Sequence, residues 1–537
     1  MEEKSTGRGF LILSFANIAG KILSMVYTII LINILGKVGQ GTHAASYSVY
    51  VFLLAVTSMG AQPAITKVIT ELRALGNHQD AFRAMRIARR YLAIFGGLIS
   101  LGLMAFAQPI ANGIKNPDAA YGIMALAPAI FFVSVLTAER AYLQSIEDMK
   151  SLAISQLMEQ LTNIIINITC SYLLLSLTGS TAFAVAGATI GATLGAAGTL
   201  AYVLYVFKTN KYKQEAFSHE KPKKRVSEKK IIKKLIKYGI PITLVAALQN
   251  SGGLIDSWNV VSRLEFAGFA HEVSIGMFGI LNRYMTLIYV PLAIVTALGV
   301  ATFPKIIQAF VQKSKKDIKI HMNYAFRLTY IITIPATVGF TILSAEIYRF
   351  IFDVDEGHQL LMYGSTVLVF MAITQIQNTV LQGVNKQYVI LGTAGLGLLL
   401  KFILNYVLIG ITDINILGAV VSNIVAFGVP MIINHRTLQK TFRVKIPMMR
   451  QCIVPLLCSG VMAGTIYFLK YPALRLINII GGGRLAFGVL VCILALIGGT
   501  IYLVTMIYTG GIRRKDMDSI HPKLFSMLPR FLRKQII

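Results

Sequence analysis

Residues 121–145 read YGIMALAPAIFFVSVLTAERAYLQS, and this run contains no charged residue before Glu139. An α-helix needs about 20 predominantly apolar residues to cross the hydrocarbon core of a bilayer. The run is long enough for that, and its charges stand near one end. It therefore predicts a transmembrane helix.

Similar apolar runs recur along almost the whole chain of 537 residues. Hydropathy and turn signals separate them into fourteen expected helices. We expect these near residues 8–36, 43–70, 90–112, 121–145, 151–176, 182–207, 238–262, 272–304, 324–347, 359–383, 387–410, 414–433, 450–470 and 484–509. The predicted fold class is an all-α polytopic membrane protein with about 14 transmembrane helices.

The overall composition favours the same class. Hydrophobic residues make up 55% of the chain and charged residues 14%, whereas about a quarter of an ordinary globular domain is charged. This balance argues against a soluble enzyme, a nucleic-acid-binding protein and a disordered chain. The cysteines fall inside expected helices, so we predict neither a disulfide framework nor a cysteine-rich metal site. They are Cys170, Cys452, Cys458 and Cys492.

The basic residues are distributed unevenly between the two sides of the expected helices. The chain has 51 Lys and Arg against 23 Asp and Glu, a formal net charge of +28. With a cytoplasmic N-terminus, most of the basic residues outside the helices fall on the cytoplasmic side, and by the positive-inside rule both termini are cytoplasmic. The opposite side holds only Lys37, Lys115, Arg263, Arg349, Lys470, Arg475 and Arg484.

Two polar segments stand outside the helices. Residues 208–237 are rich in lysine and predict a basic cytoplasmic linker, solvated or lying on anionic headgroups. Residues 511–537 interleave Leu and Phe with Lys and Arg, which predicts a basic amphipathic tail at the membrane surface.

The two sides of the linker show an internal repeat. Leu53, Thr57 and Gly60 recur as Leu292, Thr296 and Gly299, Leu143-Gln144 recurs as Leu381-Gln382, and Asn167 matches Asn405, all at nearly the same separation. The repeat predicts an N-terminal six-helix lobe at 1–207, a C-terminal six-helix lobe at 238–437 and two additional helices at 438–510. Duplicated bundles of this kind commonly enclose a site and work by alternating access, so transport is the leading function class.

Charged residues inside the expected helices are costly and need an explanation. Near helix ends, for Lys67, Glu139, Arg140 and Arg327, contact with headgroups is the simpler interpretation. The deeper charges are Lys21, Glu159, Asp256, Arg283 and Lys401.

Polar residues accompany the deep charges and suggest a water-filled cavity. Asn17 stands one helical turn before Lys21, while Asn250, Asp256 and Asn259 flank Gly252-Gly253, where the helix could bend. Packing through small residues is the alternative for this helix, and an ion pair with Glu159 or Asp256 is the alternative for Lys21. Asp256 could instead bind a coupling ion, or pair with Arg283 or Lys21.

The excess of positive charge favours an anionic substrate, since Lys and Arg pair with phosphate oxygens. No histidine pattern with metal-ligand spacing occurs, and Gly481-Gly482-Gly483 predicts a turn rather than a phosphate-binding loop. We therefore expect no enzymatic activity, no cofactor and no metal.

Several motifs carry a resemblance to a known family. The most specific segments are Lys21-Ile22-Leu23-Ser24-Met25-Val26-Tyr27, Pro63-Ala64-Ile65-Thr66-Lys67, Arg140-Ala141-Tyr142-Leu143-Gln144-Ser145, Ser155-Gln156-Leu157-Met158-Glu159-Gln160, Pro241-Ile242-Thr243 with Asp256, and Leu381-Gln382-Gly383 with Lys401 and Asn405. From the first helix into the twelfth, the chain resembles the MurJ and stage V sporulation protein B branch of the multidrug/oligosaccharidyl-lipid/polysaccharide (MOP) exporter superfamily. It departs from that family at Lys21, where Arg is usual, at Ala141 and Ser145, where Gly is usual, and after Met149, where Pro is common.

The resemblance implies a bacterial plasma-membrane flippase with V-shaped lobes, a central cationic cavity and a lipid-tail groove formed by the last two helices. The implied substrate is a pyrophosphate-linked cell-wall precursor such as lipid II, met by Lys21, Lys67, Arg140 and Arg283. Asn17, Glu159, Asn250, Asp256, Asn259 and Lys401 are the expected polar or ion-coupling residues of the cavity.

The expected partners are the lipid-linked precursor, membrane lipids and the cell-wall synthesis machinery, with no nucleic acid. Three alternatives stay open. They are an exporter of another lipid-linked polysaccharide repeat unit, a cation-coupled multidrug exporter and a membrane scaffold.

Overall fold

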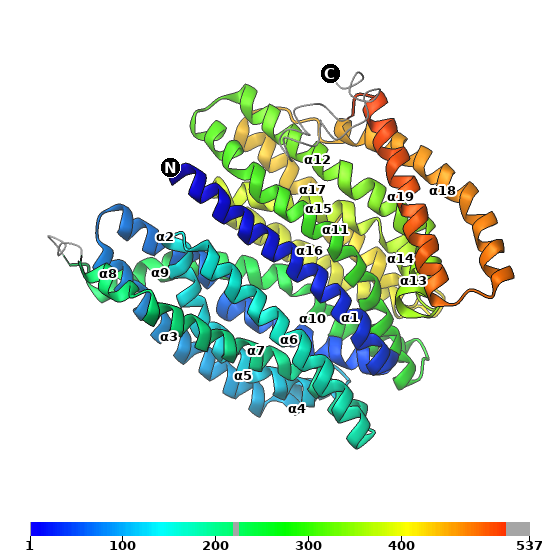
Figure 1. Ribbon diagram of the computed structural model, residues 1–537, viewed down its shortest axis with the longest axis horizontal. Helices are drawn as coiled ribbons and strands as arrows, with labels where there is room; N and C mark the ends of the chain where they lie inside the picture. The colour runs from blue at the N-terminus through cyan, green and yellow to red at the C-terminus, as the bar shows by residue number, and fades with distance from the viewer. Residues whose placement is uncertain (1, 219–224, 512–537) are drawn as a thin grey trace. The chain divides into compact units, whose positions relative to one another are not determined.

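The structure is a computed structural model that describes residues 2–218 and 225–511, and the regular elements in those ranges are all helices (Figure 1). The side chains of residues 2–19, 21, 22, 25, 297, 298, 300, 301, 304, 478 and 480 are not described. The predicted amphipathic tail, beyond Gly511, lies outside the described residues, as does the 219–224 part of the linker.

The chain forms two compact units. The first contains the described residues up to Arg283 together with Gln387–Ser422, and the second contains Tyr284–Lys386 and the described residues from Asn423. This division does not follow the linear order of the lobes expected from the repeat, which remain a prediction.

Unit 1 is built mainly from the N-terminal helices, with α16 returning from later in the chain. Its elements are α1 (Glu2–Leu54), a π-helical turn (Ala55–Met59), α2 (Ala61–Ala74), α3 (His78–Ala105), α4 (Ala107–Gly113), α5 (Ala119–Ser145), α6 (Met149–Thr178), α7 (Thr181–Thr209), α8 (Tyr212–Ser218), α9 (Glu228–Asn250), α10 (Gly252–Phe266), the start of α11 (His271–Val311) and α16 (Gln387–Leu408).

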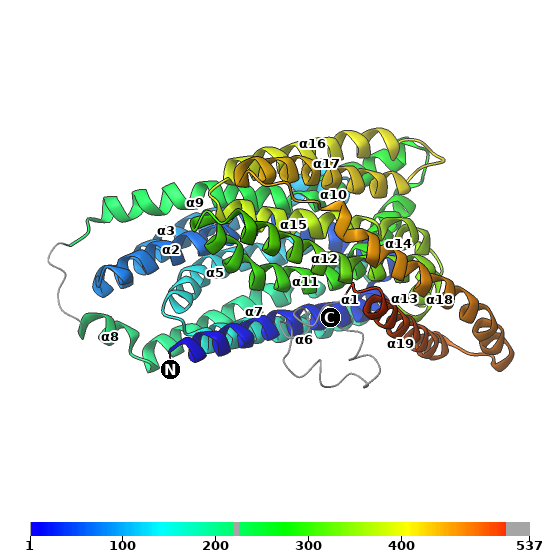
Figure 2. The ribbon, with the colours of Figure 1, turned by 90° about the horizontal axis from the view of Figure 1, so that it is seen from above.

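Unit 2 is built from the later helices. It contains most of α11, α12 (Lys315–Ile342), α13 (Ser344–Phe352), α14 (His358–Gly364), α15 (Val367–Gly383), most of α17 (Leu417–Phe442), a 3-10 turn (Met449–Cys452), α18 (Ile453–Ile480) and α19 (Arg484–Tyr508). The last two helices run along each other (Figure 2).

The expected transmembrane helices have counterparts in this structure. Eleven described helices are long and apolar enough to cross a membrane, and α14 with α15, bent by 50° at their junction, would make a twelfth. The first expected helix is the part of α1 before Gly36, whose φ of 64° breaks the helical path. The expected helix 238–262 is divided at Ser251 into α9 and α10, directly before Gly252-Gly253. The prediction of a polytopic all-α membrane protein is confirmed.

Helices α6 and α7 approach each other through small residues. Gly187, Gly191 and Gly195 stand four residues apart on α7, and a Cβ on each would lie 2.6, 2.5 and 3.0 Å from backbone atoms of α6. At Gly191 the nearest atom is the carbonyl oxygen of Asn163. Close backbone approach is the usual way in which helices associate in lipid, where apolar burial gives no advantage. Glycine is therefore required along this face.

Helix α3 begins twelve residues before its predicted start at residue 90. The Asn77 side chain accepts a hydrogen bond of 3.1 Å from the Asp80 backbone N–H, which caps the helix. The apolar residues of the first turns, including Phe82 and Met85, pack in a buried cluster with residues of α2, α5 and α9. Tertiary packing therefore extends the helix through a region that charge alone indicated to be a loop.

The described parts of the basic linker are attached to unit 1. Tyr212 Oη in α8 donates a hydrogen bond to Asp148, and the Val226 backbone N–H donates one of 2.7 Å to Asp80 Oδ2. Lys234 in α9 forms an ion pair of 2.9 Å with Glu71. These contacts hold both sides of the linker against the ends of α2, α3 and α5.

Polar contacts attach α18 and α19 to the rest of unit 2. Lys470 Nζ lies 2.9 Å from Glu346 Oε1 and donates a hydrogen bond to a carbonyl at the end of α12. Arg484 donates two hydrogen bonds of 2.8 Å to the Phe350 and Ile351 carbonyls at the end of α13. One attachment therefore starts within α18 and the other at the first residue of α19.

Candidate functional site

A buried polar cluster joins α10 to α16 in unit 1. Lys401 Nζ lies 2.7 Å from Asp256 Oδ2, and Asn405 Nδ2 donates a hydrogen bond of 2.8 Å to Asp256 Oδ1. Asn259, one turn further along α10, donates a hydrogen bond of 3.3 Å to the Phe402 carbonyl. Asp256, Lys401 and Asn259 were each predicted from the sequence, and the structure brings them together.

Each carboxylate oxygen of Asp256 accepts a hydrogen bond from a neighbouring side chain. The ammonium group of Lys401 supplies the positive charge beside Asp256, while Asn405 satisfies the other oxygen. A buried carboxylate is stable only when it is paired in this way. The sequence had suggested Arg283 or Lys21 as ion-pair partner for Asp256, or a coupling ion, and the structure places Lys401 there.

A second charged cluster joins α5 to α6. Arg140 Nη2 lies 2.7 Å from Glu159 Oε2, and Arg140 Nε donates a hydrogen bond of 3.1 Å to Ser155 Oγ. The preceding residue, Glu139, is fully buried and pairs with Arg89 of α3 at 2.8 Å. Consecutive residues of α5 therefore attach that helix to two different neighbours, and Glu159, considered as a partner for Lys21, pairs with Arg140.

The remaining predicted residues occupy separate places. Arg283 is buried, and its Nε donates a hydrogen bond of 2.6 Å to Gln40 Oε1. Lys67 is exposed in the middle of α2, with its ammonium 4.2 Å from the centre of the Tyr238 ring. Asn250 donates a hydrogen bond back to a carbonyl of its own helix, the one at Ala246.

Asn17 and Lys21 lie in α1, and their side chains are outside the described ones. The described residues just beyond them form a polar layer against α6 and α7. Gln160 Nε2 donates a hydrogen bond of 2.8 Å to Ser24 Oγ, and the Tyr27 hydroxyl donates one of 3.0 Å to a carbonyl of α7. The α1 segment that carries Lys21 is therefore anchored by polar contacts on its C-terminal side.

Three contributors were not among the site residues predicted from the sequence, although Ser155 belongs to one of the quoted motifs. Ser155 and Gln40 act as partners of predicted arginines, and nothing in a single uncharged residue marks such a role. The third is a group of arginines on α3, described below; the capping pair Asn77 and Asp80, three residues apart, was the signal that could have revealed its helix. Within residues 2–218 and 225–511, no group of three or more His, Cys, Asp and Glu is arranged to hold a metal ion.

Family models match the chain over both halves. The model described as polysaccharide biosynthesis protein matches residues 6–310, more than half of the chain. The chain belongs to this family. A second model, MatE, matches residues 241–407.

Individual relatives extend the match to nearly the whole length. The lipid II flippase MurJ of Bacillus subtilis is 25% identical over 98% of this chain and 98% of its own. Stage V sporulation protein B of the same organism is 23% identical over 90% of this chain and 93% of its own. Among solved structures, a lipid II flippase MurJ in an inward closed conformation has a TM-score of 0.67 at 15% identity, covering 92% of this chain and 98% of that one.

These similarities confirm the resemblance deduced from the motifs. The chain is a multi-pass membrane protein with the fold of the MOP superfamily. The similar proteins whose names state an activity are flippases and multidrug transporters, which agrees with the expectation of a transport protein rather than an enzyme.

Proposed function

We propose that this protein is a flippase that moves an undecaprenyl-pyrophosphate-linked peptidoglycan precursor, lipid II, from the inner to the outer leaflet by alternating access. The observation that carries the proposal is the full-length similarity to a relative named lipid II flippase. The excess of basic residues within the helices supports it independently, because pyrophosphate is an anion that lysine and arginine bind well.

In this proposal Lys21, assisted by Lys67, Arg140 and Arg283, pairs with the pyrophosphate while the undecaprenyl chain stays in lipid. Asn17, Asn250 and Asn259 contribute polar surface for the headgroup, and Glu159 holds Arg140 in place. Asp256 and Lys401 neutralise each other, so they contribute polarity without net charge. We place this protein in the bacterial plasma membrane, with both termini cytoplasmic.

The membrane potential would assist such a cycle. Moving one net charge through about 100 mV involves about 2.3 kcal/mol. An inside-negative potential therefore favours outward release of an anionic substrate and return of an unloaded cationic site.

The first test measures lipid II accessibility at the outer face of cells depleted of their own flippase, with and without this protein. We expect accessibility to be restored by the wild-type chain and lost with Lys21→Ala. Lys386→Ala, which removes an exposed lysine in the turn before α16, is the matched control and should restore accessibility fully. Full restoration by Lys21→Ala would show that Lys21 does not bind the substrate.

One alternative has support of its own. The family description, polysaccharide biosynthesis protein, fits an exporter of another lipid-linked polysaccharide repeat unit, which would carry the same phosphate chemistry. If the wild-type chain reaches the membrane without restoring lipid II accessibility, a reconstituted assay with other undecaprenyl-linked glycans identifies the substrate.

The match to the MatE family model supports a second alternative, a cation-coupled multidrug exporter. An exporter of cationic drugs calls for excess acid at its site, whereas the deep charges here are mostly basic and both deep acids are paired. Drug efflux from cells expressing the wild-type chain would favour that alternative over the proposed flippase.

A further inference from the structure

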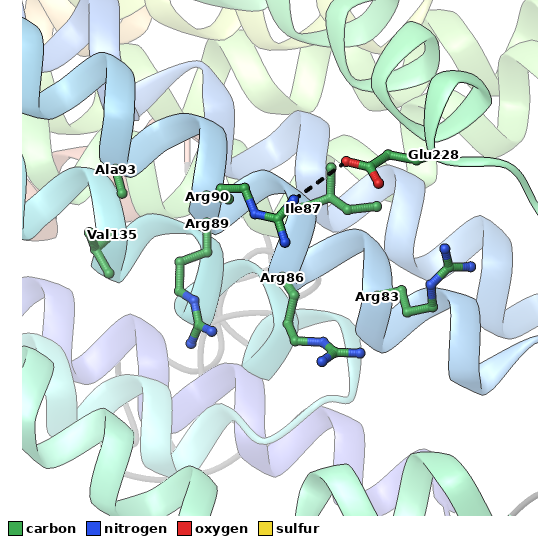
Figure 3. Close-up of a pocket in the computed structure, with 8 residues that line it drawn as sticks. All are labelled: Arg83, Arg86, Ile87, Arg89, Arg90, Ala93, Val135 and Glu228. Atoms are coloured by element: carbon green, nitrogen blue, oxygen red, sulfur yellow. Dashed lines mark ion pairs between the residues drawn. The ribbon is translucent and has the colours of Figure 1, made fainter.

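A pocket of about 660 Å³ opens on unit 1, and none of the site residues predicted from the sequence lines it. It is lined by Arg83, Arg86, Ile87, Arg89, Arg90 and Ala93 of α3, Val135 of α5 and Glu228 of α9 (Figure 3). Pockets of about 300–1,000 Å³ are typical of sites for small molecules. Four guanidinium groups around one hollow are well suited to bind an anion.

Acidic residues hold two of the arginines in place. Arg83 pairs with Asp80 at 2.6 Å, and Arg89 pairs with the buried Glu139 at 2.8 Å. These pairs orient the two guanidinium groups and partly neutralise them.

The other two arginines, Arg86 and Arg90, are more accessible to a ligand. Arg90 is exposed and lies 3.8 Å from Glu228, directed toward α9 in Figure 3. Arg86 is exposed, and its guanidinium lies 5.5 Å from the centre of the Phe82 ring. Among the described residues, no acidic side chain forms an ion pair with Arg86. Arg86 and Arg90 are thus the groups best able to receive a ligand.

The exposed side chains of α3 change from basic to apolar directly after Arg90, the last arginine of the pocket. From Tyr91 onward its large exposed side chains are all apolar. They are Tyr91, Ile94, Phe95, Leu98, Leu101 and Met104. In a transmembrane helix this change from arginine to exposed apolar residues marks the boundary between headgroups and acyl chains.

Helix α9, on the other side of the pocket, shows the same change. Its first turns expose Lys229, Lys230 and Lys233, whereas Ile240 and Leu244 are exposed further along. On both helices that line the pocket, exposed basic residues therefore give way to exposed apolar residues further along the chain.

We propose that this pocket binds the phosphodiester of an anionic phospholipid, with Arg86 and Arg90 as its principal ligands and the acyl chains along the exposed apolar face of α3. Basic pockets between transmembrane helices are the usual form of such headgroup sites. The site goes beyond the proposed function and does not depend on which glycan the chain moves.

The test uses the full-length chain in detergent, titrated with phosphatidylglycerol and, separately, with zwitterionic phosphatidylcholine, with binding read by native mass spectrometry. Arg86→Gln combined with Arg90→Gln should weaken the tightest phosphatidylglycerol binding about tenfold, since each exposed ion pair with the phosphate contributes a few-fold in affinity. Phosphatidylcholine binding should not change.

Lys315→Gln combined with Lys316→Gln is the matched control. It removes the same charge from exposed positions at the start of α12, which do not line the pocket, and should bind phosphatidylglycerol as the wild type does. Equal loss in both double variants would show a general effect of net charge and overturn the site. Unchanged binding in the arginine variant would overturn it as well.

Arg86→Gln alone covers the case in which the double variant does not fold, because its exposed side chain has no acidic partner among the described residues. It should weaken phosphatidylglycerol binding severalfold. Inorganic phosphate distinguishes a soluble ligand from a lipid. If about 1 mM phosphate displaces phosphatidylglycerol from the wild type, the pocket is a site for free phosphate and the lipid assignment is wrong.

Discussion

Lys401 Nζ lies 2.7 Å from Asp256 Oδ2, and both side chains are buried between α16 and α10. A charge removed from water carries a penalty of several kcal/mol, which the attraction of its partner offsets only while both are present. Each of these two residues is therefore far more costly to neutralise alone than to neutralise together with the other.

We accordingly expect Asp256→Asn and Lys401→Met each to destabilise the protein by about 3–5 kcal/mol, and the double variant to recover a large part of that loss. Thermal unfolding in detergent, analysed as a double-mutant cycle, measures the effect. The half-exposed pair of Glu71 and Lys234 is the control, and its cycle should give about 1 kcal/mol or less. Additive losses for Asp256 and Lys401 would contradict the prediction.

Arg140 has two proposed roles that experiment can separate. Its ion pair with Glu159 stabilises the contact of α5 with α6, while its proposed role in transport is to bind pyrophosphate. We expect Arg140→Gln to abolish lipid II accessibility. The variant in which Glu159→Gln is added should recover thermal stability but not transport, because the phosphate ligand is still missing. Recovery of transport in the double variant would show that Arg140 acts only through its ion pair.

Gly191 lies where α7 touches the backbone of α6, and Gly198 on the same helix has open space around its Cα. Gly191→Ala should therefore destabilise the chain, with a reduced yield of folded protein and a lower Tm, because the methyl group would clash with Asn163. Gly198→Ala should be neutral or stabilising by up to about 1 kcal/mol, the difference in helix propensity. Equal Tm values for the two variants would show that the helices separate readily.

Asp148, between α5 and α6, gives a pH-dependent contribution to stability. Burial alone would raise its pKa, but hydrogen bonds from the Tyr212 hydroxyl and from Ser151 outweigh burial and lower the pKa. Asp148 therefore binds a proton less readily in the folded state than in the unfolded state. Its contribution to the free energy of unfolding is complete above the ordinary Asp pKa of about 3.9. That contribution is lost as the pH falls through the lower pKa of the folded state.

Asp148→Asn should therefore lower the stability by about 1 kcal/mol at neutral pH, the difference between a charged and a neutral hydrogen-bond acceptor. The gap in Tm between wild type and variant should stay constant down to about pH 5 and narrow only below about pH 4. Asp413→Asn, in the exposed turn between α16 and α17, is the control and should show no gap at any pH. A gap that widens toward acid would reverse the expected sign.

The helices were predictable because long apolar runs have few alternatives in a membrane. Even the division of the helix around Gly252-Gly253 was visible as a cluster of polar residues and glycine. The start of α3 was not predictable, because a segment rich in arginine is typical of a cytoplasmic loop. Only the packing of Phe82 and Met85 makes this segment helical.

The charged residues of the candidate site were predictable, but their partners were not. Asp256 and Lys401 are far apart in sequence, and nothing in one chain indicates which of several deep cations would meet a given acid. Local spacing does not help either, because Arg140 pairs with Glu159 across two helices rather than along one. Register between helices decides such pairs, and register depends on the packing of many small residues at once.

The glycine face of α7 has a mechanical consequence. Where side chains separate two helices, they can change rotamer and so allow the helices to slide. At the glycines of α7 the backbone of α6 is in direct contact, and no side chains lie between the two helices there. If α6 slid along α7 by a fraction of a turn, their backbones would clash. The two helices therefore move as one rigid unit. A conformational change in this protein must therefore move α6 and α7 together. The bending occurs at hinges elsewhere, such as Gly36 and Ser251.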